Sequence, residues 1–226
     1  MLMKHVVITC VFIIAYLACH AQNQFGIFAG PQSSTATYSV RGNKQSTQNK
    51  FGFQAGCGWK IEFDNHLFFS PAAFYSLKGY KVKLNQFADP PDTAAIDNNT
   101  TMHTFELAFL LQFDLGNKPG HFFIKAGPSL DFQLAGKEKF HLKSGTLVDR
   151  DIPYGFSQYG HYAASLLMQL GFETKSGFMV FGQYNLGLGN LNNADNGPSI
   201  RHRVYGISIG TYLLRKKIVP GTRNKE

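Results

Sequence analysis

The chain has 226 residues, which suits one β-barrel domain, since such domains often run undivided to about 200–250 residues. Aromatic residues reach 14%, with 21 Phe and 1 Trp, whereas charged residues make up only 16%, below the ~25% of typical soluble domains. The net charge of +8 raises the question of a nucleic-acid partner, but the chain has no motif combining Lys or Arg with aromatic residues, so we expect no nucleic acid.

The N-terminus has the layout of a secretory signal peptide. Lys4 precedes an apolar run over residues 6–18, and Cys19-His20-Ala21 supplies the small residues of a cleavage site. An apolar run of 13 residues is too short to span a bilayer core of about 30 Å as a helix. A lipoprotein signal at Cys19 ranks lower, because Tyr16 stands where such signals usually carry Leu.

Removal of this segment sets the domain organisation. We expect residues 1–21 to be the signal peptide, 22–215 an outer-membrane β-barrel domain and 216–226 a basic C-terminal tail. Cys10 and Cys19 leave with the signal, so Cys57 remains alone and an internal disulfide or a thiolate metal cluster is excluded.

Eight segments of the mature chain alternate apolar residues with polar or small ones, the period of a β-strand. They cover, in order, residues 25–30, 50–63, 67–78, 103–115, 121–134, 161–173, 180–189 and 202–213. The hairpin at residues 103–134 is the clearest, because each of its strands is long enough to cross a bilayer, which takes about 9–11 tilted residues.

The connections between these strands alternate strictly in length. Long loops are expected at residues 32–49, 85–101, 135–157 and 191–199, and short turns at 64–65, 116–120 and 175–177. Outer-membrane barrels have this arrangement, with short turns on the periplasmic side and long loops outside. The pattern therefore predicts an all-β, eight-stranded antiparallel up-and-down transmembrane barrel in the cell outer membrane.

The two faces of these strands differ in chemistry. One face is made of Phe, Leu, Ile, Val, Ala and Tyr, and the other carries charges among Gly, Ser, Gln and Asn. Charged side chains are costly against lipid, so we expect them to point into the lumen. The expected lumen charges are Lys60, Glu62, Lys78, Glu106, Asp114, Lys125, Asp131 and Glu173. Because the interior of an eight-stranded barrel is filled by side chains, no large aqueous pore is predicted.

The hairpin sequence over residues 105–113, FELAFLLQF, and the segment at residues 123–130, FIKAGPSL, resemble the PorT-like outer-membrane β-barrel family. Residues 185–188 and 203–213 fit the last two strands of that family, so the resemblance extends over residues 25–214. It implies an eight-stranded barrel of the OmpX/OmpA type, without shared catalytic residues, and an accessory role in export. The chain departs from such barrels at its end, since they often stop just after an aromatic residue in the last strand, whereas here residues 215–226 continue.

The sequence offers no motif for chemistry. It lacks Gly-x-Ser-x-Gly and Gly-x-Gly-x-x-Gly, and its six remaining histidines are scattered singly, so we expect no catalytic, cofactor-binding or metal-binding residues. An acid/base pair among Glu106, Asp114, Asp131 and Glu173 is conceivable, but a network of ion pairs with Lys60, Lys78 and Lys125 is favoured.

We therefore expect the mature protein to be a monomeric, non-enzymatic barrel embedded in outer-membrane lipid. Its extracellular loops would contact a protein partner, or the barrel would serve envelope integrity or export. Two alternatives stay open. One is an outer-membrane enzyme with its site at the loop rim, and the other is a periplasmic lipocalin-like barrel that binds an apolar ligand inside. The lipocalin-like alternative requires the apolar face to point inward.

Overall fold

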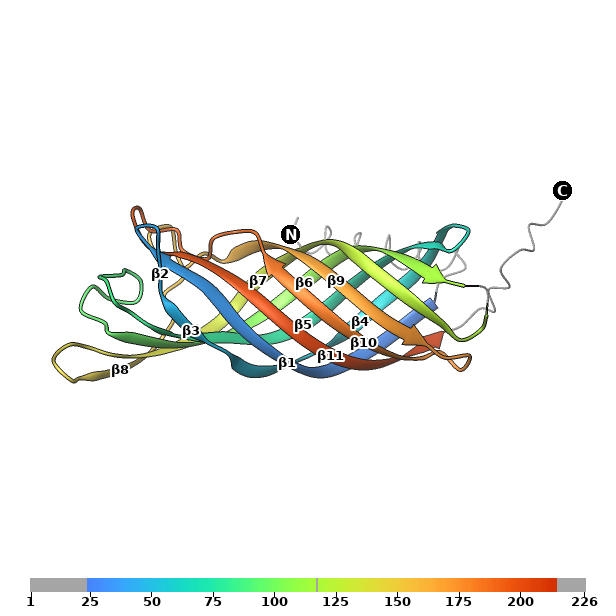
Figure 1. The fold of residues 1–226 in the computed structure, drawn as a ribbon, viewed down its shortest axis with the longest axis horizontal. Coiled ribbons are helices and arrows are strands. Elements are labelled where there is room, and N and C mark those ends of the chain that lie inside the picture. Colours follow the sequence, from blue (N-terminus) through green and yellow to red (C-terminus); the bar gives the residue numbers. More distant parts are fainter. Residues whose placement is uncertain (1–23, 117, 215–226) are drawn as a thin grey trace, which may run out of the picture.

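The computed structural model describes residues 24–116 and 118–214, in which eight long antiparallel strands form a closed ring (Figure 1). These strands are β1 (Gln24–Val40), β4 (Lys50–Asp64), β5 (Leu67–Lys83), β6 (Asp97–Leu115), β7 (His121–His141), β9 (Tyr162–Glu173), β10 (Phe178–Gly187) and β11 (Ser199–Leu214). Each pairs with the next along the chain, and β11 pairs with β1 to close the ring. The predicted up-and-down barrel is confirmed, whereas the signal peptide and the basic tail lie outside the described residues.

The two ends of the barrel differ in their connections. The three short turns lie at one end, together with the start of β1 and the end of β11 (Figure 1). The long connections lie at the other end and carry three further strands, β2 (Asn43–Lys44), β3 (Ser46–Gln48) and β8 (Leu147–Asp151). In the part of the chain that the structure describes, no helix is long and apolar enough to cross a bilayer.

The strands reach further toward the long-loop end than the sequence pattern indicated. The prediction of a short first strand and a loop at residues 32–49 is wrong, because β1 continues to Val40 and pairs with β11 as far as Ser39. Likewise β7 extends to His141 and pairs with β8, inside the expected loop at residues 135–157. At its long-loop end, the barrel therefore continues past the eight amphipathic segments expected from the sequence.

The apolar face of the strands points outward, as predicted for a barrel in lipid. Phe113, Ile124 and Leu170 are 47%, 45% and 59% exposed, whereas Lys125 beside Ile124 is buried. Leu107 and Leu166 lie on the same outward face, between buried neighbours. This orientation rules out the lipocalin-like alternative.

Toward the long-loop end the same strands reverse their polarity. In β1 the buried residues are Ala36, Tyr38 and Val40, and the outward residues between them are Thr37 and Ser39. On β5, β7 and β11 the corresponding outward positions carry basic residues while apolar ones turn inward. They are Lys81, Lys83, Lys137, Lys139, Arg201 and Arg203. The apolar face points toward whichever side is dry, so the reversal marks the level at which the outer surface passes from lipid to water.

A β-bulge adjusts this reversal in β7. The register with β6 shifts at His103/Thr104, so Leu134 and Ala135 both lie exposed on the outer wall. Beyond the bulge, Glu138 and Phe140 turn inward. An extra residue in one strand changes which side chains face each side, which is the usual effect of a bulge.

Aromatic rings border the apolar band on both sides. Four aromatic residues pair in register across four adjacent strands and form the row nearer the long-loop end, called the upper row. They are Tyr75, Phe105, Phe132 and Tyr162. The lower row includes Phe122 and Phe172, whose ring centroids lie 5.1 Å apart, and Phe25 against Trp59. From Phe122 to Phe132 the strand covers about 34 Å, or roughly 25 Å along the membrane normal at the usual tilt, which matches the apolar band of outer-membrane barrels.

Candidate functional site

The lumen contains two ion-pair clusters. At the short-turn end, Lys60 Nζ lies 2.6 Å from an Asp114 carboxylate oxygen and 3.0 Å from one of Glu173. His121 joins them, with its Nε2 3.0 Å from Asp114 and 3.5 Å from Glu173. Each residue comes from a different strand, so the cluster ties β4, β6, β7 and β9 together across the interior.

The second cluster lies in the middle of the lumen. Lys78 Nζ contacts Glu106 at 2.7 Å and Asp131 at 2.8 Å, and all three side chains are at most 4% exposed. Asn185 donates a hydrogen bond to Glu106, and the Ser165 hydroxyl donates one to Asp131. Two buried carboxylates thus share one ammonium and two neutral donors. Buried charges that are paired and hydrogen-bonded in this way form a structural network, as favoured from the sequence.

The remaining expected lumen charges differ. Lys125 is buried and donates to the Ser70 hydroxyl at 3.2 Å. Glu62 is exposed near the end of β4, so its assignment to the lumen is wrong. It lies at the margin beside the Asp64–Leu67 turn, where the register shifts and alternation no longer determines which side a residue faces.

Side chains fill most of this interior. A cavity of about 30 Å³ lies among Phe28, Ser70, Lys125 and other lumen residues, space for about one water molecule. Gly171 is also buried in the barrel, and a Cβ there would approach Phe123 and Phe181 to 2.6 and 2.5 Å. Glycine at this position leaves room for the two rings, as a narrow barrel requires.

The histidines are not all as isolated as their spacing suggested. Besides His121, His141 lies beside a carboxylate, with its Nδ1 2.9 Å from Asp97 on the outer wall. Both His–Asp contacts join neighbouring strands, so the spacing of these residues along the sequence could not reveal them. The pairing register of the strands could. Within the described residues, no group of three or more His, Cys, Asp or Glu is arranged to hold a metal ion.

Above the lumen, the long-loop end is closed by an apolar plug. It joins inward residues of the strand extensions to residues of the long connections. Its members include Tyr38, Val40, Tyr80, Val82, Ala88, Ala95, Met102, Phe140, Ile152, Tyr159, Leu191 and Ile200. The residues at 88 and 95 come from the β5–β6 connection, and those at 159 and 191 from the connections flanking β9 and β10. The loops therefore fold over and into the mouth of the barrel.

A buried carboxylate anchors this plug. Glu138 is 0% exposed and accepts hydrogen bonds from the Tyr159 hydroxyl at 3.0 Å and from Arg150 Nε at 2.8 Å. Arg150 also donates to the Pro91 carbonyl, and Tyr38 donates to the Pro90 carbonyl at 2.9 Å. Burial raises the pKa of Tyr159 well above its ordinary value, and the nearby Tyr80 and Glu138 raise it further.

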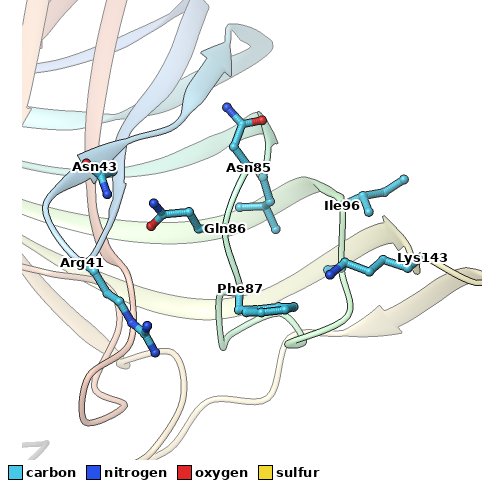
Figure 2. A pocket seen from close by; sticks show the side chains of 9 residues that line it. Arg41, Asn43, Asn85, Gln86, Phe87, Ile96 and Lys143 are labelled. Atoms are coloured by element: carbon cyan, nitrogen blue, oxygen red, sulfur yellow. The ribbon is translucent and has the colours of Figure 1, made fainter.

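Beside the plug, the long loops form a pocket of about 350 Å³ (Figure 2). The Gln45 side chain joins two of its walls, since its Oε1 accepts a hydrogen bond from the Asn85 backbone amide at 2.8 Å. Backbone hydrogen bonds from Leu84 to Ile96 and from Lys143 to Ala94 fix the opposite wall. The lining residues are Arg41, Asn43, Leu84, Asn85, Gln86, Phe87, Ala95, Ile96 and Lys143.

The pocket is cationic and has an aromatic surface. Lys143 Nζ lies 4.1 Å from the centre of the Phe87 ring, which is 61% exposed. Arg41 approaches from the opposite side (Figure 2). The lining carries two cations, three side-chain amides and no carboxylate, so it is suited to an anionic ligand.

Arg41 adopts an unfavourable backbone conformation. Arg41 and Gly42, between β1 and β2, have φ values of 49° and 83°, as in a two-residue hairpin turn that favours Asn-Gly. A left-handed conformation costs a residue with a Cβ about 1–2 kcal/mol. An arginine is therefore held where asparagine or glycine would be more stable, and strain of this kind often marks a functional position.

Comparisons with known proteins agree with the barrel geometry. The family model described as an outer membrane protein beta-barrel domain matches residues 20–193. The chain belongs to this family. It is thus a protein of the cell outer membrane, and by the rule for such barrels its short turns face the periplasm and its long loops the exterior.

Several solved structures are similar to the chain at low sequence identity. OprG from Pseudomonas aeruginosa is 16% identical, with 87% of this chain and 98% of that chain covered and a TM-score of 0.48. Ail, the attachment invasion locus protein of Yersinia pestis, is 13% identical, with coverage of 85% and 99% and a TM-score of 0.45. Neisserial surface protein A is 10% identical, with coverage of 82% and 96% and a TM-score of 0.40. No curated protein matches the sequence.

Proposed function

We propose that this protein is a non-enzymatic outer-membrane barrel that binds an anionic ligand with its extracellular loops. The observation that carries the proposal is the loop pocket, where Arg41 and Lys143 flank the exposed ring of Phe87 without a carboxylate in the lining. The filled lumen and the apolar plug support a role as a rigid platform rather than a channel.

The ligand chemistry follows from the lining. Arginine presents paired N–H donors that match carboxylate, sulfate or phosphate oxygens, and lysine adds a point charge. The amides of Asn43, Asn85 and Gln86 offer further donors and acceptors for hydroxyl groups. An acidic saccharide or another small ligand that combines an anionic group with hydroxyls fits this set.

Binding to the folded barrel in nanodiscs of neutral lipid tests the proposal. The probe is a sulfated oligosaccharide, with its desulfated form as the comparison, and calorimetry gives the affinities. Wild type should bind the sulfated form more tightly, and added salt should weaken the binding. The double variant Arg41→Asn/Lys143→Gln should bind at least about a hundredfold more weakly, because two hydrogen bonds to a charged group, each contributing about 1.5–3 kcal/mol, are lost.

The variant design separates binding from folding. Arg41→Asn places the favoured residue in the turn, so the barrel should remain folded. Lys118→Gln/Lys175→Gln removes the same charge at the periplasmic end and should leave the affinity unchanged. Equal affinity for the desulfated form, or an unchanged affinity in the pocket variant, would contradict the proposal.

The PorT-like resemblance suggests a second, finer role as an accessory component of protein export. The periplasmic turns and the long loops are the surfaces available for such a partner. Deletion of the protein followed by comparison of the secreted proteins tests this role, and an unchanged secretome would remove it.

The enzyme alternative requires reactive groups that converge at the loop rim. Asp97 and His141 form an acid–base pair there, but in the described chain neither side chain has a recorded contact with a serine, threonine or cysteine side chain. We therefore favour the binding role.

A further inference from the structure

The outer wall of the barrel carries a second cationic surface, separate from the loop pocket. It extends from the start of β4 across β5 and β6 to β7, just beyond the upper aromatic row, and faces sideways rather than up. We define the lysine face as Lys50, Lys81, Lys83, Lys137 and Lys139. All but Lys50 are exposed.

Strand register brings these residues side by side. Lys81 pairs with Asn99, and Asn99 pairs with Lys139, so two lysines flank one amide across three adjacent strands. One row closer to the membrane, Gly79 pairs with Thr101, which pairs with Lys137. A groove of about 380 Å³ follows the first of these rows, and the residues that line it include Lys81, Lys83, Asp97, Asn99 and Lys139.

The positive charge of this face is only partly neutralised. Lys139 forms an ion pair with Asp149 at 2.7 Å, and Asp97 is engaged by His141. The stem of Lys50 lies close over Gly79, and its Nζ donates to Asn99 at 2.7 Å. Within residues 24–116 and 118–214, Lys81 and Lys83 form no ion pair. They are available to an external anion.

The height of the lysine face points to a lipid. Gly79 and Lys81 lie four and six residues beyond Tyr75 of the upper aromatic row. At the usual strand tilt this separation is roughly 10–15 Å along the membrane normal. Lysine side chains extend toward the interfacial region of a bilayer while their stems lie along the protein wall. Below them, Phe105 and Leu134 are exposed and lie where acyl chains contact the barrel.

We propose that the lysine face binds the phosphate groups of an anionic glycolipid in the outer leaflet, while the acyl chains of that lipid lie on the aromatic row and apolar band beneath. Asn99 and Thr101 would add hydrogen bonds to phosphate or sugar oxygens. The sideways orientation favours a ligand held in the membrane plane over a soluble anion, which would reach the upward-facing loop pocket more readily.

Native mass spectrometry of the barrel released from nanodiscs tests this site. The discs contain neutral phosphatidylcholine with a small fraction of diphosphorylated lipid A or of its dephosphorylated form. Wild type should retain the phosphorylated lipid selectively. Lys81→Gln/Lys83→Gln should retain it roughly thirtyfold less, since each unpaired lysine near a membrane surface strengthens anionic lipid binding about fivefold.

Two double variants serve as matched controls. Lys118→Gln/Lys175→Gln removes two charges at the periplasmic end, and Arg41→Asn/Lys143→Gln removes two from the loop pocket. Both should retain the lipid as wild type does. Heat-modifiable mobility on gels verifies that every variant is folded.

Three results would overturn the site. They are equal retention by the lysine-face variant, equal retention of the dephosphorylated lipid, and loss of lipid in the loop-pocket variant. A second binding measurement, with a soluble phosphate in place of the lipid, distinguishes the two sources of phosphate. If inositol hexakisphosphate binds wild type in lipid-free detergent and this binding is lost in Lys81→Gln/Lys83→Gln, the face is a soluble-anion site and the lipid proposal fails.

Discussion

Lys78 on β5 and Glu106 on β6 form an ion pair of 2.7 Å inside the barrel, where their side chains are 2% and 1% exposed. Taking two charges out of water is costly, and their attraction offsets that cost only while both partners remain. The pair therefore makes the barrel sensitive to loss of one partner and tolerant of loss of the whole cluster.

Removal of Lys78 alone should destabilise the barrel strongly. Lys78→Met leaves Glu106 and Asp131 buried without their shared cation, at a cost of about 3–5 kcal/mol. Urea unfolding in lipid vesicles measures the loss in free energy of unfolding. The triple variant Lys78→Met/Glu106→Gln/Asp131→Asn should recover most of it. A single variant as stable as wild type would mean that the carboxylates are neutral or hydrated, against the ion-pair account.

A charge on the outer wall should act according to its height. Phe109 is 45% exposed near the middle of the apolar band, so Phe109→Arg should destabilise the folded barrel by about 2–4 kcal/mol. Thr37→Arg lies on the outward face above the band, opposite Arg201, and the like charges should cost at most about 1 kcal/mol. Folding titrations in vesicles give both values, and equal effects would contradict the assigned membrane boundary.

The Glu138 network should hold the loops over the barrel mouth. Arg150→Gln removes the cation that joins Glu138 to the Pro91 carbonyl. We expect the loops to be cleaved faster by an external protease such as chymotrypsin, while the strands stay protected. Lys139→Gln on the neighbouring strand breaks only an exposed pair with Asp149 and serves as the control. Unchanged cleavage in Arg150→Gln would show that the apolar plug alone holds the loops.

The plug should also loosen in alkali through Tyr159. Burial, Tyr80 and Glu138 raise the pKa of Tyr159 in the folded state above its ordinary value of 10.0. The stabilisation from its neutral form is thus complete below pH 10 and is lost as the pH rises toward the folded-state pKa. Absorbance at 295 nm of wild type and Tyr159→Phe should coincide near pH 10 and diverge only at higher pH. A difference at pH 10 would show an accessible phenol.

The sequence was sufficient for the membrane part of the fold because lipid enforces one simple pattern. Across residues 103–134, every second residue is apolar, and Phe113, Ile124 and Leu130 do point outward. The lumen charges followed from the same alternation. It failed at Glu62, next to a turn with shifted register, where neighbouring residues no longer alternate strictly between faces.

The extension above the membrane was missed for a physical reason. A strand in lipid has an apolar outer face, whereas in water the apolar residues turn inward, as Ala36, Tyr38 and Val40 do. The alternation was present in Thr35-Ala36-Thr37-Tyr38-Ser39-Val40 but with opposite phase. The loop pocket could not be predicted, because Arg41, Phe87 and Lys143 are distant in sequence and meet only through loop contacts.

The odd residues of β6 face lipid and its even residues face the filled lumen, and the other membrane-spanning strands alternate in the same way. Spin labels placed singly at residues 105–114 in bilayers, in a background with Cys57 replaced, test this alternation most directly. The rate of collision between the label and oxygen should alternate with a period of two, high at 105, 107, 109, 111 and 113 and low at the even positions. The opposite phase, or a uniform profile, would contradict it.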